Sequence, residues 1–284
     1  MKNKLKPYLL LAPISITVVF IMGVGILNAV YQSLGYFPQI GLNNFTLDYY
    51  KEILRNETFL KSFIFTIKTS FISSSLSIIL GVIIAYILSK VRYSRIRKNI
   101  LNLPVIVPHI VVVTFIFMIF SQSGIISRIL YNLGIIKDSS QFINMVSDKN
   151  GIGIILVYIW KGAPFTAITT YNILKNINDG LENVAMNLGA SKVQVFRHII
   201  LPLVMPSILS SFLILFAFSF GSFEVPFLIG PSTPKTLSVQ AYISYSSSDL
   251  AQRPIAMSIN VILSTLSIII LVIYNKIFKK LYKL

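Results

Sequence analysis

Long apolar runs alternate with short polar segments along the whole chain. A bilayer-spanning helix needs about 20 mostly apolar residues, and six runs reach that length. They cover residues 8–34, 63–88, 100–120, 152–174, 203–229 and 255–277. The first run is longer than the core of a signal peptide and lacks a clear small-residue cleavage site, so we expect it to be retained. The pattern predicts an all-α integral membrane protein with six transmembrane helices.

The polar segments between these runs are too short to hold a soluble domain. The longest lie at 35–60, 121–151 and 230–254, and they carry turn residues or a short amphipathic stretch. We therefore expect residues 1–284 to form a single transmembrane domain.

Composition supports lipid as the solvent. Charged residues make up 12% of the chain and hydrophobic residues 55%, whereas a soluble domain carries about 25% charged residues. The chain has no cysteine, which excludes disulfides, thiolate metal sites and cysteine nucleophiles. His109 and His198, the two histidines, fall on opposite sides of a span, so no metal site is expected.

The net charge of +16 follows membrane topology rather than nucleic-acid binding, because the basic residues cluster between the spans. Fifteen lie on one predicted side, against eight in the longer segments of the other side. The positive-inside rule places the richer side, with both chain termini, in the cytoplasm. The fifteen are Lys2, Lys4, Lys6, Lys90, Arg92, Arg95, Arg97, Lys98, Lys175, Lys192, Arg197, Lys276, Lys279, Lys280 and Lys283.

Prolines occur inside several predicted spans, at positions 13, 104, 108, 164 and 226. Each removes a backbone donor and can kink a helix. Two interpretations remain open, namely ordinary helix bending and irregular backbone that lines a water-filled pathway.

The cytoplasmic segment 176–202 has a pattern that no spanning helix needs. Asp179 and Glu182 form a capping-box pattern that predicts a short helix, and Gly189 predicts its end in a left-handed conformation. Ser191, with Gln194 three residues later, predicts the start of a second helix. Because the apolar faces of these helices are too short to span lipid, they are expected to dock on another protein.

The same segment resembles the EAA loop of permeases in binding-protein-dependent ABC importers, the MetI-like family. That motif reads Glu-Ala-Ala, three residues, Gly, nine residues, Ile, any residue, Leu, Pro. Here Asn183, Val184 and Ala185 stand six to four residues before Gly189, and Ile199, Leu201 and Pro202 follow in register. The resemblance implies a type I importer fold and a loop that couples to a separate ATPase. The residues it assigns to coupling are Glu182, Asn183, Val184, Ala185, Leu188, Gly189, Ala190, Ser191, Phe196, Ile199, Leu201 and Pro202.

One position departs from the motif. Asn183 replaces the motif glutamate and cannot make its charged contact, while Glu182 stands one residue earlier. Two possibilities stay open: Glu182 supplies the contact, or the contact is absent.

The resemblance also defines the partners. The chain has no phosphate-binding loop of the G-x-x-x-x-G-K-[ST] type, so we expect no enzyme activity and no bound cofactor, with ATP and Mg on a partner ATPase. The other implied partners are a second permease subunit, identical or similar, an extracellular solute-binding protein and membrane lipid. The implied location is the cytoplasmic (inner) membrane of a bacterium.

Polar residues inside the spans are candidates for the solute pathway, because charges there are costly. Glu224, with Ser222 and Phe223, resembles the corresponding stretch of spermidine/putrescine-type permeases, which implies a small cationic solute such as a polyamine. The alternative is an ion pair of Glu224 with Lys68 or Lys161.

Lys161, after Trp160, either meets an anionic solute or extends to the outer interface, and the same choice holds for Lys68. The serines of the second span are expected to pack helices rather than bind a ligand.

The function that follows is the permease subunit of an ATP-driven importer. A different solute (a sugar, a phosphonate, or iron or thiamine) is the first alternative. An ATP-independent secondary transporter or channel is the second, and it would need no docking segment. A membrane enzyme lacks a catalytic cluster.

Overall fold

The computed structural model describes residues 2–91, 95–175 and 179–282, and within those ranges it is helical with no strand. Six helical segments in the described part of the chain are long and apolar enough to cross a membrane. They are Leu10–Ser33, Glu57–Ser89, His109–Asn132, Ile152–Leu174, Lys192–Gly221 and Leu250–Lys276. The predicted all-α fold with six spans is confirmed.

The chain divides into two compact units. Unit 1 comprises Met1–Leu60 and Leu237–Leu266, and unit 2 comprises Lys61–Thr236 and Ser267–Leu284. Two long helices, α3 (Glu57–Ser89) and α13 (Arg253–Tyr282), each contribute residues to both units.

In unit 1, a buried serine at the end of the first helix makes hydrogen bonds that link three helices. Ser33 closes α1, and its hydroxyl accepts a hydrogen bond from the Tyr50 hydroxyl of α2 at 2.7 Å. The Ser258 hydroxyl of α13 donates to the Ser33 carbonyl at 3.1 Å. One residue thus joins three helices. The helices of this unit are α1 (Lys2–Ser33), α2 (Asp48–Arg55), α12 (Leu237–Tyr245) and the first half of α13 (Arg253–Tyr282).

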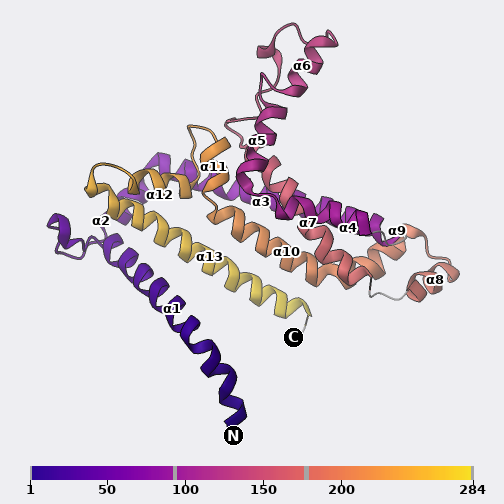
Figure 1. Cartoon of the computed structure of the whole chain (residues 1–284), viewed down its shortest axis with the longest axis horizontal. Coiled ribbons are helices and arrows are strands. Elements are labelled where there is room, and N and C mark those ends of the chain that lie inside the picture. The colour runs from indigo at the N-terminus through magenta and orange to yellow at the C-terminus, as the bar shows by residue number, and fades with distance from the viewer. Residues whose placement is uncertain (1, 92–94, 176–178, 283–284) are drawn as a thin grey trace. The chain divides into compact units, whose positions relative to one another are not determined.

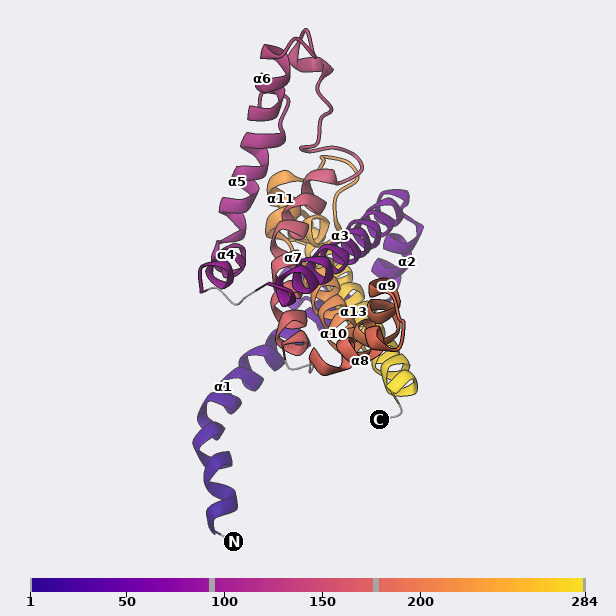
Figure 2. The same cartoon turned by 90° about the vertical axis from the view of Figure 1, so that its right-hand side faces the viewer.

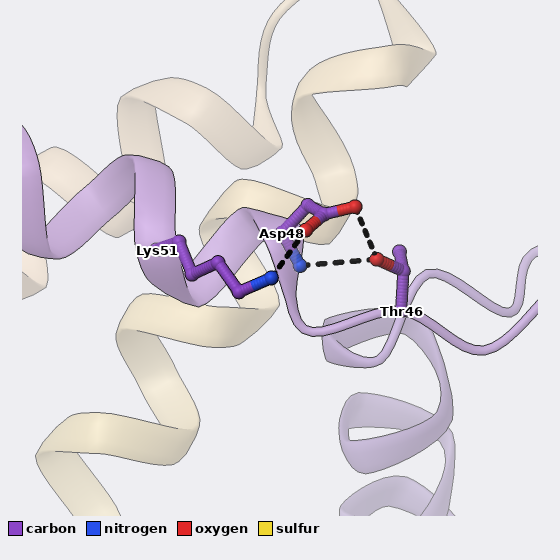
Figure 3. A network of polar contacts seen from close by, with 3 residues as sticks. All are labelled: Thr46, Asp48 and Lys51. Atoms are coloured by element: carbon purple, nitrogen blue, oxygen red, sulfur yellow. Dashed lines mark hydrogen bonds and ion pairs between the residues drawn. The ribbon is translucent and has the colours of Figure 1, made fainter.

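Short-range polar contacts fix the start of α2 in unit 1 (Figure 3). The Thr46 hydroxyl donates to an Asp48 carboxylate oxygen at 2.6 Å, and the Asp48 amide donates back to Thr46 Oγ1 at 3.1 Å. Lys51 donates to the other carboxylate oxygen at 2.9 Å. The bond from Thr46, followed by the bond and charge of Lys51, holds the pKa of Asp48 below its usual value. A carboxylate in the first turn also suits the positive end of the helix.

Unit 2 is built around α7, which packs against α4, α5, α10 and α11. Figure 1 shows α7 alongside α10, and Figure 2 shows α5 and α6 extending from that helix pair. Besides the second half of α13, the described α-helices of this unit are α3 (Glu57–Ser89), α4 (Arg95–Ile106), α5 (His109–Phe120), α6 (Ile125–Asn132), α7 (Ile152–Leu174), α8 (Asp179–Asn187), α9 (Lys192–Val195), α10 (Leu201–Gly221) and α11 (Glu224–Ile229).

Small residues let α3 and α7 approach closely. A Cβ added at Gly162 of α7 would lie 2.5 Å from the Ser77 hydroxyl oxygen and 2.8 Å from its Cβ. The Ser77 hydroxyl donates to the Tyr158 carbonyl at 3.4 Å. The serine side of α3 therefore serves as a packing face at this level, which agrees with the role expected for small residues in membrane helices.

The third span differs from the predicted range 100–120. Helix α4 ends at Ile106, and α5 starts at His109 after an extended Pro108 (ψ 147°). Because Pro108 has no N–H, it cannot donate to the carbonyl four residues earlier. The apolar run was thus wrongly assigned to one helix, and the span instead continues through α6 to Asn132.

The fifth span also differs from its predicted range, 203–229. It begins at Lys192 and ends at Gly221, where Ser222 is extended (ψ 138°). Helix α11 then starts at Glu224. The placement of Glu224 late in the fifth helix was therefore wrong: the residue opens a separate short helix, in which Pro226 falls within the first turn, where a missing N–H costs little.

Candidate functional site

The expected turn at Gly189 is present in the cytoplasmic segment. Gly189 has φ of +89°, and its amide donates to the Met186 carbonyl at 3.0 Å. The Ala190 amide donates to the Ala185 carbonyl, also at 3.0 Å. This pair of bonds is the Schellman motif that ends a helix with a left-handed residue. The turn predicted from the sequence is confirmed. The first three residues of the expected segment, 176–178, and the Asp179 side chain lie outside the described part of the chain.

The second helix starts with the predicted capping box. The Gln194 amide donates to the Ser191 hydroxyl at 3.3 Å, and the Ser191 amide donates to the Gln194 side-chain oxygen at 2.8 Å. A π-helical turn, η3 (Phe196–Ile200), then joins α9 to α10 without a break. The Leu201 amide reaches back five residues to the Phe196 carbonyl. Pro202 follows at once, and a π turn accommodates a residue that cannot donate to the usual carbonyl.

The motif residues separate into a buried face and an exposed face. Ala185, Ala190, Phe196, Ile199 and Leu201 pack against a cluster built by α3, α7 and α10. The opposite face is apolar and open: Leu188 is 84% exposed and Val193 74%. The other exposed apolar members are Leu181, Val184 and Met186. Most of this face lies on α8 and the turn after it, which are too short to cross lipid, whereas Val193 lies in the first turn of the fifth span.

Glu182 is engaged within its own chain. Its carboxylate forms an ion pair with Lys90, the residue that follows α3, and the two side chains are 19% and 41% exposed. The Lys90 ammonium also lies 5.4 Å from the ring centre of Tyr86, which meets Phe196 edge to face at 4.9 Å. Asn183 is exposed. The structure therefore places Glu182 toward α3.

Sequence reasoning missed the Lys90 contact, because it counted Lys90 only as a topology signal. The available signal was the opposite charge of two residues predicted on the same membrane side.

Unit 2 also holds a cavity of about 220 Å³ between α3, α4, α5, α7 and α10. Of the residues predicted for the solute pathway, Lys161 lines it. Serines of α3 and α10 and the rings of His109, Phe165 and Phe218 supply much of the remaining wall. The His109 ring stacks on Phe218 with centres 5.2 Å apart.

Lys161 makes a hydrogen bond to the backbone at the break between α4 and α5. Its ammonium donates to the Val107 carbonyl at 2.7 Å. That carbonyl lacks its usual helical donor, because the Val111 amide bonds to Pro108 instead. Lys161 lies nine residues into the α7 span, about 14 Å at 1.5 Å per residue. Of the two alternatives left open for Lys161, extension to the outer interface is not what this contact with the Val107 carbonyl favours.

The other predicted pathway residues do not line this cavity. Trp160 packs against the hydrophobic core around Val157, and Phe223 stacks on Phe227 at 4.9 Å. Lys68 is exposed and donates to the Asn150 side chain at 3.4 Å. Ser222 and Glu224 lie at the break between α10 and α11, where Glu224 is exposed. Among the described residues, neither lysine is ion-paired with Glu224.

Six helical segments long and apolar enough to span a bilayer, with breaks at Pro108 and Ser222, define a polytopic α-helical membrane protein. Residues 77–283 match the family described as binding-protein-dependent transport system inner membrane component. The chain belongs to this family.

Individual relatives match only part of this chain. A probable sulfate transport system permease of Helicosporidium sp. subsp. Simulium jonesii is 30% identical over 60% of this chain, and a putative ferric transport system permease of Haemophilus influenzae is 27% identical over 78%. The matched region spans 60% and 33% of the lengths of these relatives.

Among solved structures, a bacterial ABC transporter involved in alginate import has a TM-score of 0.81 and 19% identity, covering 98% of this chain and 96% of that chain. This likeness shows the fold. The names of the relatives give no support to a polyamine-type permease.

Proposed function

We propose that the chain is the membrane-spanning permease subunit of an ATP-driven ABC importer in a bacterial cytoplasmic membrane. In this role it forms a solute pathway and couples solute movement to ATP hydrolysis on a separate subunit.

The docking face of α8 and α9 carries the proposal. Leu188 and Val193 expose apolar side chains on a segment whose turn, capping box and buried face are all in place. Exposed apolar patches mark contact sites for other proteins or for a membrane, and α8 is too short to span a membrane. The family match makes an ATPase the partner that fits. The residues proposed for this contact are those of the EAA-like register from Glu182 to Pro202, with the ion-paired Glu182 acting through its hold on α3.

The remaining partners follow from the same proposal. ATP and Mg belong to the ATPase, a second permease subunit completes the pathway, and an extracellular binding protein delivers the solute. One of the structural relatives was solved with a periplasmic protein that carries an alginate pentasaccharide, which supports this kind of partner.

The class of solute is the finer part of the proposal. A polyamine was expected from Glu224, but this residue does not line the cavity and is exposed. The cavity instead presents Lys161 and His109. A small solute other than a polyamine, the alternative considered from the sequence, therefore has the better support.

Co-purification with the ATPase tests the coupling role. We expect Leu188→Ser, and more strongly deletion of residues 183–191, to reduce the amount of ATPase recovered with the permease. Leu133→Ser is the matched control, because Leu133 is 67% exposed but lies after α6, outside the docking segment.

Equal recovery of the ATPase with all of these variants would contradict the coupling role. It would favour the ATP-independent transporter instead, provided that each variant reaches the membrane in the same amount.

A further inference from the structure

The cavity in unit 2 has a charge pattern that selects one class of ligand. Its ionisable lining residues are Lys161, His109 and Tyr158, and no aspartate or glutamate is among the described residues that line it. Within the described part of the chain Lys161 has no ion-pair partner. An unpaired cation inside a membrane domain is costly, and a bound anion would offset that cost.

Lys161 retains capacity for a ligand after its structural contact. An ammonium group has three N–H donors, and one of them bonds to the Val107 carbonyl. Two donors therefore remain for a group in the cavity. One N–H of the Lys161 ammonium therefore has a structural role, and the other two are available to a ligand.

Ser74 is a second, independent indication. It lies on α3, lines the cavity and is 2% exposed, and its hydroxyl has no hydrogen-bond partner among the described residues. Buried hydroxyls without a partner are uncommon and point to a missing water or ligand. The hydroxyl and the ammonium come from different helices and border the same space.

We propose that this cavity binds a small anion through an oxyanion group, with Lys161 and Ser74 as donors and the stacked rings of His109 and Phe218 as part of the wall. The inference rests on the proposed importer function and specifies the class of its solute. The volume of about 220 Å³ is several times the 30 Å³ that a water molecule occupies in the liquid. That space accommodates an inorganic oxyanion or a small organic anion. A sulfate permease among the relatives is consistent with this class.

Glu224 acts against such a ligand. It does not line the cavity, but its carboxylate is near enough to act electrostatically on Lys161 and His109. Removing this charge is expected to tighten anion binding. A pathway for cations predicts the reverse, so Glu224→Gln distinguishes the two by the sign of its effect.

The test measures binding to the assembled transporter in lipid nanodiscs, after co-purification has shown that the ATPase is present. The probes are sodium sulfate, as an inorganic oxyanion, sodium succinate, as an organic anion, and spermidine, as a cation. Each is compared with sodium chloride at equal ionic strength, and the thermal unfolding midpoint is followed against probe concentration.

The variants separate ligand contacts from structural contacts. Lys161→Gln keeps a donor for the Val107 carbonyl but removes the charge, and it should weaken anion binding about tenfold or more, as expected for a charge-assisted hydrogen bond. Ser74→Ala should weaken binding about threefold without lowering the midpoint of the anion-free transporter, since the hydroxyl has no partner to lose. Glu224→Gln should tighten anion binding.

A saturable rise in midpoint with sulfate or succinate, reduced in both weakening variants, would support the proposal, and the stronger of the two probes would identify the type of anion. The proposal is overturned if neither anion shifts the midpoint, or if the shift is unchanged in Lys161→Gln and Ser74→Ala. It is also overturned if spermidine binds and Glu224→Gln abolishes that binding. Because co-purification of the ATPase is checked before the binding assay, each of these outcomes would reject the anion site without deciding the importer function.

Discussion

Exchanging the charges of Lys90 and Glu182 tests whether this ion pair holds the docking segment for its partner. The pair joins the residue after α3 to α8, across 92 positions of the sequence. Lys90→Glu or Glu182→Lys alone places like charges against each other and should release α8 from α3. The double variant restores an ion pair of reversed polarity.

The exposure of the two side chains sets the expected magnitude. Fully exposed ion pairs contribute about 0.2–1 kcal/mol. Lys90 is 41% exposed, so solvent screens the pair, but Glu182 is only 19% exposed, which places the estimate at the upper end, about 1 kcal/mol. If docking requires α8 to stay in the position that this ion pair holds, each single variant should weaken ATPase binding about fivefold.

The assay is the dissociation constant of the ATPase for the permease in nanodiscs, measured for wild type, both single variants and the double variant. The double variant should return to within about twofold of wild type, because coupled residues are non-additive. Lys51→Glu is the control, since its pair with Asp48 in unit 1 is largely exposed and lies outside the segment. Losses that simply add in the double variant would refute the reasoning and would indicate that each residue contacts the ATPase independently.

Three further predictions concern stability, read from the thermal unfolding midpoint. Gly189→Ala should destabilise by about 1–2 kcal/mol, because φ is +89° and no atom lies within 4 Å of an added Cβ; Gly189→Asn should cost less, and equal costs would contradict a purely conformational effect. Gly162→Ala should cost about 1–3 kcal/mol from overpacking against Ser77, and the lost stability should return in the Ser77→Gly background. Its control is Gly25→Ala, where an added Cβ has no atom within 4 Å, and this variant should be neutral or stabilising. Lys161→Met should cost about 1–3 kcal/mol by leaving the Val107 carbonyl unpaired, and a midpoint as high as that of Lys161→Gln would show that this bond contributes little.

Features encoded locally were predictable from the sequence. The turn at Gly189 and the capping box at Ser191 depend on residues within three to five positions, and both are present. The fourth span matches its predicted range because it is mostly apolar and turn residues lie close to both of its ends. Hydropathy alone is enough for such elements.

Features decided by distant partners were not predictable. A proline inside an apolar run can kink a helix or end it, and at Pro108 the broken backbone is completed by Lys161, which stands 54 positions away from Val107. Glu182 could have faced a partner protein or its own chain, and the choice depends on Lys90 across the fold. The cavity likewise requires knowledge of which faces of five helices meet.

The unbroken course from α9 through η3 into α10 has a mechanical consequence. One continuous rod carries the exposed Val193 near one end and the cavity residues Leu215, Phe218 and Ser219 near the other. From Val193 to Ser219 the rod measures about 39 Å at 1.5 Å per residue, and a tilt of about 5° displaces one end by about 3 Å relative to the other. Because a helix is stiff, a small rotation at the cytoplasmic end of the rod displaces the cavity residues by several tenths of the cavity's diameter. The π turn is the point where the rod departs from regular α-helical hydrogen bonding.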